Sequence, residues 1–141
     1  MHLGHNNPRF DYTMGGTPLA SSDLEKDIGV YIHTSLKPSH HCATIAKKAN
    51  SVLGQLSRGI TYRDKETFIP LYTMYVRPHL ENAAQAWSPW TVGDIHVLES
   101  IQRRAIRMVT NFQAKNYEHK LEEAGLSYQV GLVIIPCQNQ K

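Results

Sequence analysis

Residues 39–58, SHHCATIAKKANSVLGQLSR, decide the fold, because this stretch carries a clear helical repeat. Small and apolar side chains recur every three or four residues, at Cys42, Ile45, Ala49, Val52 and Leu56. A helix turns by about 100° per residue, so this spacing places them on one stripe. Ser39 is a fair N-cap, and Gly59 suits the C-terminal end. The stretch therefore predicts a long amphipathic helix that begins just after Pro38.

A second helical segment is expected over residues 64–87. Its expected inner face consists of Phe68, Leu71, Tyr72, Tyr75 and Val76. Pro70 and Pro78 lie within this segment, and each removes a backbone N–H and crowds the preceding turn. The two prolines predict a kink or a division into two helical pieces.

Two more helices are indicated by their end signals. Thr91-Val92-Gly93-Asp94 resembles a capping box with aspartate in place of the usual glutamate. It precedes the apolar stripe Leu98, Ile101, Ala105, Val109 and Phe112. A short helix at about Tyr117–Ala124 is expected to end at Gly125, since glycine suits the left-handed residue after a helix.

The first 35 residues are expected to form strands and turns. Gly15-Gly16 suits a two-residue hairpin turn between short strands, and Pro18 marks the second of these as an edge strand. Ile28, Val30 and Ile32 alternate with other residues and predict a third, half-buried strand in the same small sheet.

Together these elements predict an α+β fold. A small antiparallel sheet is expected over residues 1–36 and a helical domain of three or four helices over residues 37–126. Residues 127–141 form a tail of ambiguous structure.

Composition sets further bounds. The chain has 141 residues and 41% hydrophobic content, which suits one domain with a real core. Its apolar runs are far shorter than the roughly 20 residues of a membrane span, and no secretory signal is visible. Cys42 and Cys137 are too few and too distant for a disulfide framework, so we expect an intracellular protein without membrane contact.

Charge is segregated along the chain, although the net charge is only +3. From Ile28 to Arg63 there are five basic residues and no acid, and from Ser100 to Lys115 there are four and again no acid. Helical spacing places six of them on the outer faces of two helices or on their flanks: Lys47, Lys48, Arg58, Arg103, Arg104 and Arg107. Such faces suit phosphate contacts, but they are also ordinary solvated surfaces, and the pattern alone leaves both interpretations open.

Gly54 lies between Lys47 and Arg58 on the outer face of the first helix. Glycine within a helix costs about 1 kcal/mol relative to alanine, so its presence calls for a reason. One interpretation is that the absent side chain lets a phosphodiester backbone come close.

Catalytic and metal-binding patterns are weak. His40-His41-Cys42 lacks the further ligands of a zinc site, so we expect a buried Cys42 and surface histidines. No motif for a nucleophile, a phosphate loop or a dinucleotide is present, and no catalytic residue, metal or cofactor is assigned. Trp87 and Trp90 could stack on bases, but we favour a role in holding the loop onto the core.

Several stretches together resemble the reverse transcriptases of non-LTR retrotransposons of the jockey and chicken-repeat types. The resemblance begins at Met1–Gly4, and Leu24–Ile32 is similar to the "KDLGV" strand that follows the catalytic palm motif of that family. The similarity continues, in order and at family spacing, through residues 41–56, 75–81, 86–89, 98–105 and 121–126.

The resemblance implies a function that composition does not show. The strand region would support the primer terminus, and the helices would form a thumb that grips an RNA–DNA hybrid or a DNA duplex through the six cations. The family's paired catalytic aspartates have no counterpart here, Asn82 replaces a usual tyrosine, and residues 127–141 depart from the family pattern. The resemblance therefore implies a truncated RNA-directed DNA polymerase fragment that is no enzyme by itself.

Two alternatives to nucleic-acid binding remain. The chain could be a co-opted protein-interaction module that associates, with itself or with a partner, through the surface that would face a palm domain. It could also be a retroelement relic without function.

Overall fold

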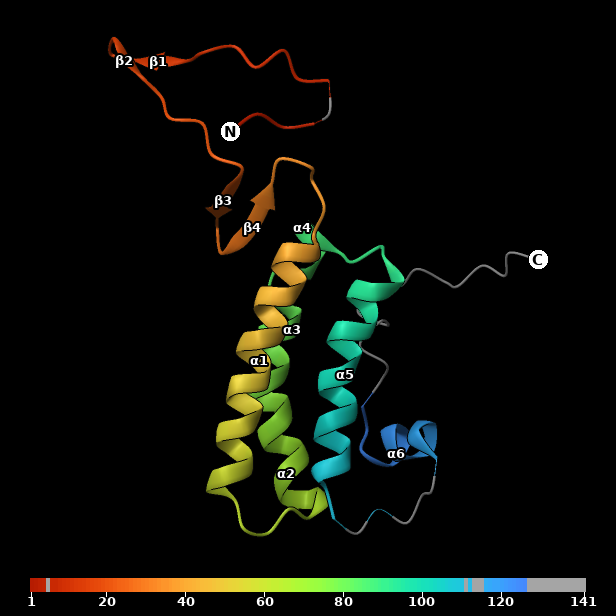
Figure 1. Ribbon diagram of the computed structural model, residues 1–141. Helices are drawn as coiled ribbons and strands as arrows, with labels where there is room; N and C mark the ends of the chain where they lie inside the picture. Colours follow the sequence, from red (N-terminus) through yellow and green to blue (C-terminus); the bar gives the residue numbers. More distant parts are fainter. Residues whose placement is uncertain (5, 111, 113–115, 127–141) are drawn as a thin grey trace, which may run out of the picture.

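The computed structural model describes residues 1–4, 6–110, 112 and 116–126. Within them, two antiparallel β-hairpins precede a set of helices, which confirms the α+β prediction (Figure 1). The predicted tail, residues 127–141, lies outside the described residues. The strands are β1 (Thr13–Met14), β2 (Thr17–Pro18), β3 (Leu24–Asp27) and β4 (Val30–His33). The helical elements are α1 (Ser39–Gly59), α2 (Lys65–Leu71), η1 (Tyr72–Val76), α3 (Arg77–Glu81), α4 (Ala84–Trp87), α5 (Val92–Met108) and α6 (Tyr117–Glu123).

The first hairpin agrees with its sequence signal. Gly15 and Gly16 have φ values of 58° and 81°, so both turn residues use the left-handed region that glycine adopts at little steric cost. Thr13 pairs with Pro18 and Met14 with Thr17.

The second hairpin corrects two predictions. The third strand does not start at Ile28, which lies in the turn between β3 and β4 with φ 47° and 92% of its surface exposed. The strands do not share one three-stranded sheet either, because β1–β2 and β3–β4 form separate two-stranded ladders. The apolar pattern did not predict β3, since its sequence LEKD shows no alternation, and only the family resemblance included these residues in a strand.

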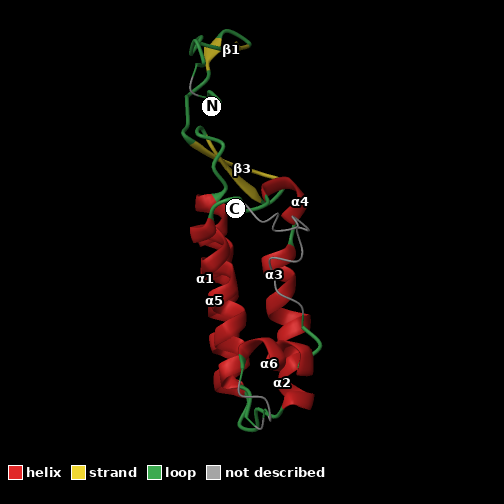
Figure 2. Ribbon diagram, turned by 90° about the vertical axis from the view of Figure 1, so that its right-hand side faces the viewer, coloured by secondary structure: helices red, strands yellow, loops and turns green. Residues whose placement is uncertain are grey.

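The helices form two layers around one core. α1 and α5 run side by side in the same direction, and the segment α2–η1–α3 runs back against α1 (Figure 1). Turned by 90°, α1 and α5 lie together on one side and α2 and α3 on the other (Figure 2). The fully buried side chains at the centre of this core include Cys42, Ala49, Leu53, Phe68, Tyr72, Val76, Ile101 and Ala105.

Asp94 joins the N-terminal ends of the two parallel helices. Thr91 caps α5 as predicted, since its hydroxyl oxygen accepts a hydrogen bond from the Asp94 N–H at 3.2 Å. The Asp94 carboxylate accepts from the Thr91 hydroxyl at 2.6 Å and from the Ser39 hydroxyl at 2.9 Å. Ser39 is therefore not the N-cap of α1, which is Pro38, and its side chain instead fixes α1 against α5.

The C-terminal end signal is also confirmed. Gly125 has φ 65°, and its N–H donates to the Glu122 carbonyl at 2.9 Å. The Leu126 N–H donates to the Leu121 carbonyl at 2.9 Å, and both leucine side chains are buried. This is the paired hydrogen-bond pattern in which a left-handed glycine ends a helix.

The two prolines do not break the helix where they lie, although the predicted segment 64–87 is divided further on, at Asn82 and Ala83. The chain stays helical from Lys65 to Glu81, with the π-helical turn η1 between Pro70 and Pro78. Pro78 has no N–H, and a proline ring crowds the carbonyl four residues earlier. A wider turn just before it relieves this crowding, and the Arg77 N–H accordingly donates to the Tyr72 carbonyl five residues back.

Tyr72 carries an unusual buried hydroxyl. The side chain is fully buried, and its hydroxyl has no hydrogen-bond partner among the described residues. Burial raises the pKa of this phenol, so the group stays neutral. An unpaired buried hydroxyl costs desolvation free energy that an apolar ring of the same shape avoids.

Replacing Tyr72 by phenylalanine is therefore expected to stabilise the protein by about 1 kcal/mol. Urea unfolding of both proteins measures the change. Tyr31→Phe is the matched control, because the Tyr31 ring is only partly buried, and it is expected to change the free energy of unfolding by less than about 0.5 kcal/mol. A clear loss of stability in Tyr72→Phe would mean that the hydroxyl is hydrogen-bonded.

Candidate nucleic-acid interface

The outer surface of α1 and α5 carries no exposed acid. α1 contains no aspartate or glutamate. α5 contains Asp94 and Glu99, which are 8% and 6% exposed and therefore buried. Every exposed charged side chain on these two helices is thus basic or histidine.

Two hydrogen bonds set the register of α1 against α5. Near their first residues, Ser39 bonds to Asp94, and about three turns later the Arg104 guanidinium donates to the Asn50 amide oxygen at 3.3 Å. The interval from Ser39 to Asn50 on α1 nearly equals the interval from Asp94 to Arg104 on α5, so the two helices keep the same axial register over this length.

Four of the six predicted cations lie on the side marked by the Asn50–Arg104 contact. Around α1, Lys47 and Arg58 lie within about 80° of Asn50, and around α5, Arg107 lies within about 60° of Arg104. All four side chains are exposed. We call Lys47, Arg58, Arg104 and Arg107 the basic face.

The other two cations are directed elsewhere. Lys48 lies about 160° around α1 from Asn50, on the opposite flank. Arg103 pairs with the Glu99 carboxylate at 3.3 Å and lies over the Tyr117 ring of α6, 5.0 Å from its centroid. Glu99 raises the pKa of Arg103, which keeps this guanidinium charged and engaged in a structural contact. The structure therefore does not bring all six residues onto one surface.

The cations of the basic face are available for other contacts. Among the described residues, no hydrogen bond or ion pair engages Lys47, Arg58 or Arg107, and Arg104 makes the single bond to Asn50. A side chain at Gly54 would meet Arg58 Nη1 at 3.9 Å, which is an ordinary contact. Packing within the chain thus does not require this glycine, and its role in a close approach of phosphates stays a prediction.

His40-His41-Cys42 does not gather metal ligands. Cys42 is fully buried as predicted, and burial raises the pKa of its thiol to about 12. The prediction that His41 lies at the surface is wrong, since this residue is 1% exposed. Its Nδ1 accepts a hydrogen bond from the Tyr31 N–H at 3.2 Å, and this bond holds β4 onto α1. In the part of the chain that the structure describes, no three histidine, cysteine or acidic side chains converge on a metal position.

His41 makes the attachment of β4 sensitive to pH. Its Nδ1 must be unprotonated to accept the Tyr31 N–H, and its ring lies edge-on to Trp87 with centroids 5.0 Å apart. Burial, together with the charge of His40, lowers the pKa of His41 below its usual value of about 6.5. The unfolded chain therefore binds more protons than the folded one as the pH falls below about 6.5.

We accordingly expect stability to be full above pH 7 and to decline as the pH falls from about 6.5 toward the lowered pKa, by at most about 1.4 kcal/mol per pH unit. Urea midpoints at pH 7.5, 6.5 and 5.5 measure this slope. His41→Gln is expected to be less stable at pH 7.5 but to show a flatter slope, whereas an unchanged slope would assign the titration to another group.

The two tryptophans have different environments. Trp87 is 6% exposed, so its ring packs into the core as predicted. Its Nε1–H donates to the Asn82 carbonyl at 2.8 Å, which fixes the turn before α4, a segment that the prediction did not include. Trp90 is 64% exposed, and the same prediction is wrong for it.

Comparisons with known proteins add no relatives: no protein-family model, no curated protein and no solved structure matches this chain. None of the helices in the described ranges is both long and apolar enough to cross a bilayer.

Proposed function

We propose that this chain is the thumb region of a non-LTR retrotransposon type of RNA-directed DNA polymerase, and that it binds a template–primer duplex through the duplex backbone. The observation that carries the proposal is the basic face, where four cations lie on two parallel helices without an exposed acid. The family-like motifs from Leu24–Ile32 to residues 121–126 support the polymerase origin.

The geometry favours phosphates as the ligand. Lys47 and Arg58 are eleven residues apart on one helix, a span of about 16 Å along its axis. Over this axial distance one strand winds about half a turn around a duplex, so the two cations would contact phosphates on opposite sides of a groove rather than successive phosphates of one strand. Arginine and lysine donate to phosphate oxygens and fix the position of a duplex, but these contacts carry no sequence information.

The proposal assigns no catalysis to this chain. Nucleotide addition by two metal ions needs carboxylates that converge on ions about 4 Å apart. The paired aspartates that supply them in the family have no counterpart in this sequence. A template–primer would therefore be held here and extended by a catalytic domain elsewhere.

Salt dependence tests the proposal. With about four phosphate contacts, raising salt from 50 to 200 mM is expected to weaken duplex binding on the order of 100-fold. Filter binding with an RNA–DNA hybrid and a DNA duplex, each in two unrelated sequences, measures this change and the sequence preference. Absent binding, or binding that salt does not weaken, would contradict the proposal.

A second candidate, protein interaction, is favoured by the N-terminal region. Its large apolar side chains are mostly exposed, among them Phe10, Tyr12, Met14, Leu19 and Ile28. Of the hydrophobic residues described in 1–36, only Val30 is buried. A region with so little core of its own offers apolar surface and unpaired strand edges to a partner.

Light scattering over a range of concentrations tests self-association through this surface. We expect a rise in mean mass with concentration that Ile28→Ser with Met14→Ser abolishes, while Val97→Ser with Tyr62→Ser, at exposed positions on α5 and in the α1–α2 connection, leaves it unchanged. A monomer at all concentrations would count against self-association.

A further inference from the structure

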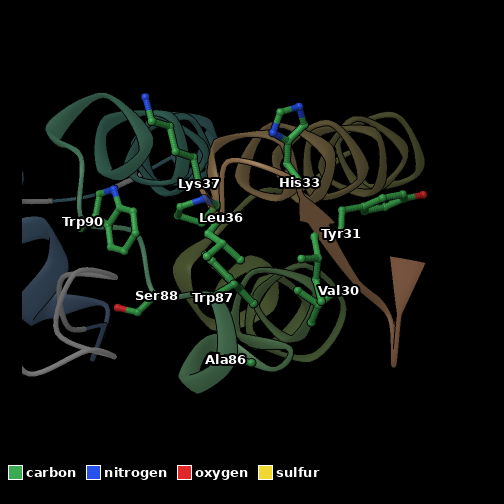
Figure 3. A pocket seen from close by; sticks show the side chains of 11 residues that line it. Val30, Tyr31, His33, Leu36, Lys37, Ala86, Trp87, Ser88 and Trp90 are labelled. Carbon is green, nitrogen blue, oxygen red and sulfur yellow. The ribbon is translucent and has the colours of Figure 1, made fainter. Parts of the chain in front are cut away.

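A cavity of about 360 Å3 opens between the second hairpin and the segment that follows α4 (Figure 3). Its size falls within the range of small-ligand sites. Two separate stretches line it: β4 with the connection from β4 to α1, and the residues from α4 to Trp90. In Figure 3, Trp90 and Tyr31 lie on opposite sides, with Leu36 and Trp87 between them.

Aromatic rings shape this cavity. Trp87 is fixed by its hydrogen bond to the Asn82 carbonyl and by its edge contact with His41. Trp90 has no such fixation among the described contacts and is 64% exposed beside the opening. A large indole ring left exposed at a cavity offers a face on which a planar group can stack.

The charge of the lining selects among planar ligands. It contains Lys37 and His33 and no acid, and Lys37 forms no ion pair with the described residues. In Figure 3 the Lys37 ammonium projects outward from the rim. A ligand that uses both features is a planar aromatic group that carries a negative charge, whereas a purely apolar peptide would leave the cation unused.

The connection that carries Lys37 is held in an unusual conformation. Leu36 has φ 58°, a region that non-glycine residues rarely adopt, and half of its surface is exposed. The Leu36 N–H donates to the His33 carbonyl at 2.8 Å, and the Ser35 N–H donates to His33 Nδ1 at 3.1 Å. These hydrogen bonds fix the backbone of the turn that brings Lys37 to the cavity.

We propose that this cavity binds an unpaired nucleobase together with its phosphate, by stacking on Trp90 and by pairing with Lys37. The identity of the ligand rests on the proposed nucleic-acid function. Lys37 lies two residues before the start of α1, and Lys47 lies eight residues after Ser39, about 12 Å along the helix axis. A short single-stranded extension of a duplex on the basic face spans this distance and can place its end in the cavity.

Intrinsic fluorescence tests the proposal directly, because both tryptophans of the chain line the cavity. We expect adenosine 5′-monophosphate to change the fluorescence of the full chain saturably. Adenosine without phosphate should bind at least threefold more weakly, and inorganic phosphate alone should cause no change. A nucleotide that causes no saturable change overturns the proposal.

Two variants separate the contributions of stacking and charge, with affinity measured by equilibrium dialysis of the nucleotide. Trp90→Ala is expected to weaken nucleotide binding at least fivefold, and Lys37→Met to abolish the advantage of the nucleotide over adenosine. Both residues are exposed, so an unchanged melting temperature should show that the fold is intact. Tyr62→Ala, which removes an 83% exposed ring from the α1–α2 connection, should leave the affinity unchanged. An unchanged nucleotide affinity in Trp90→Ala overturns the proposal.

Two further measurements test whether the cavity binds a different ligand, and whether the cavity proposal can fail or hold independently of the duplex proposal. An apolar tetrapeptide that binds the cavity more tightly than the nucleotide identifies a protein-docking site and overturns the proposal. Arg104→Glu with Arg107→Glu should leave mononucleotide binding intact, since neither residue lines the cavity. If duplex binding fails in the parent protein but the nucleotide binds, the cavity proposal stands and only the basic face is refuted.

Discussion

Replacing Arg104 and Arg107 together by glutamate is expected to weaken duplex binding on the order of 100-fold near 100 mM salt. The change removes two of the four cations of the basic face and adds two charges that repel phosphate. The plot of log affinity against log salt should become less steep. The magnitude of its negative slope should fall from about 3.6 to about 1.8 or below, since each phosphate contact contributes about 0.9. Filter binding over a salt series measures both quantities.

The matched control changes the net charge by the same amount away from the basic face. Arg9 and Lys48 are exposed, and Lys48 lies on the opposite flank of α1. Arg9→Glu with Lys48→Glu is expected to weaken binding less than about fivefold, through long-range repulsion alone. Equal losses in the two double variants would mean that net charge, rather than this surface, determines binding.

The long helices could be predicted because their signals are local. The repeat of Ile45, Ala49 and neighbouring residues fixes one face of α1 without reference to the rest of the chain. The same holds for the cap at Thr91 and the left-handed Gly125, whose hydrogen bonds join residues close in sequence. Local hydrogen bonding and periodicity together were sufficient for these elements.

The second hairpin could not be read in the same way. β3 is mostly exposed and carries charges, so no apolar period marks it. Ile28 looked like a strand residue because it is branched and alternates with Val30, yet it occupies the turn. The hydrogen bond from the Tyr31 N–H to His41, ten residues away, holds β4 in place, and such a contact produces no periodic pattern in the sequence.

The basic face and the cavity likewise could not be predicted from local sequence patterns alone. Charge segregation and helical spacing identified the six cations, but the pairing of Arg103 with Glu99 and its contact with the Tyr117 ring became apparent only in the structure. The cavity gave no combined signal, because its lining comes from two stretches that are far apart in sequence, residues 30–38 and residues 86–90. Tertiary placement therefore decides which residues of a given type can act together.

Phe68→Ala is expected to destabilise the protein by about 3–5 kcal/mol, the usual cost of removing a large ring from a packed core. Phe68 is fully buried, and the buried positions that follow it, Tyr72, Val76 and Leu80, recur at intervals of four. A π-helical turn has more residues per turn than an α-helix, and it keeps this four-residue repeat on one face. The loss would be a large fraction of the 5–15 kcal/mol that stabilises a typical domain, and urea unfolding would measure it.

Tyr75→Ala is the informative comparison, because a regular helix of 3.6 residues per turn would place Tyr75 on the inner face beside Phe68. In the structure Tyr75 is 50% exposed, since the wide turn η1 rotates it outward. We therefore expect its replacement to cost about 1 kcal/mol or less, several times less than the replacement of Phe68. Equal losses at the two positions would mean that the segment is an ordinary α-helix, and that Pro70 and Pro78 are accommodated by some means other than a π turn.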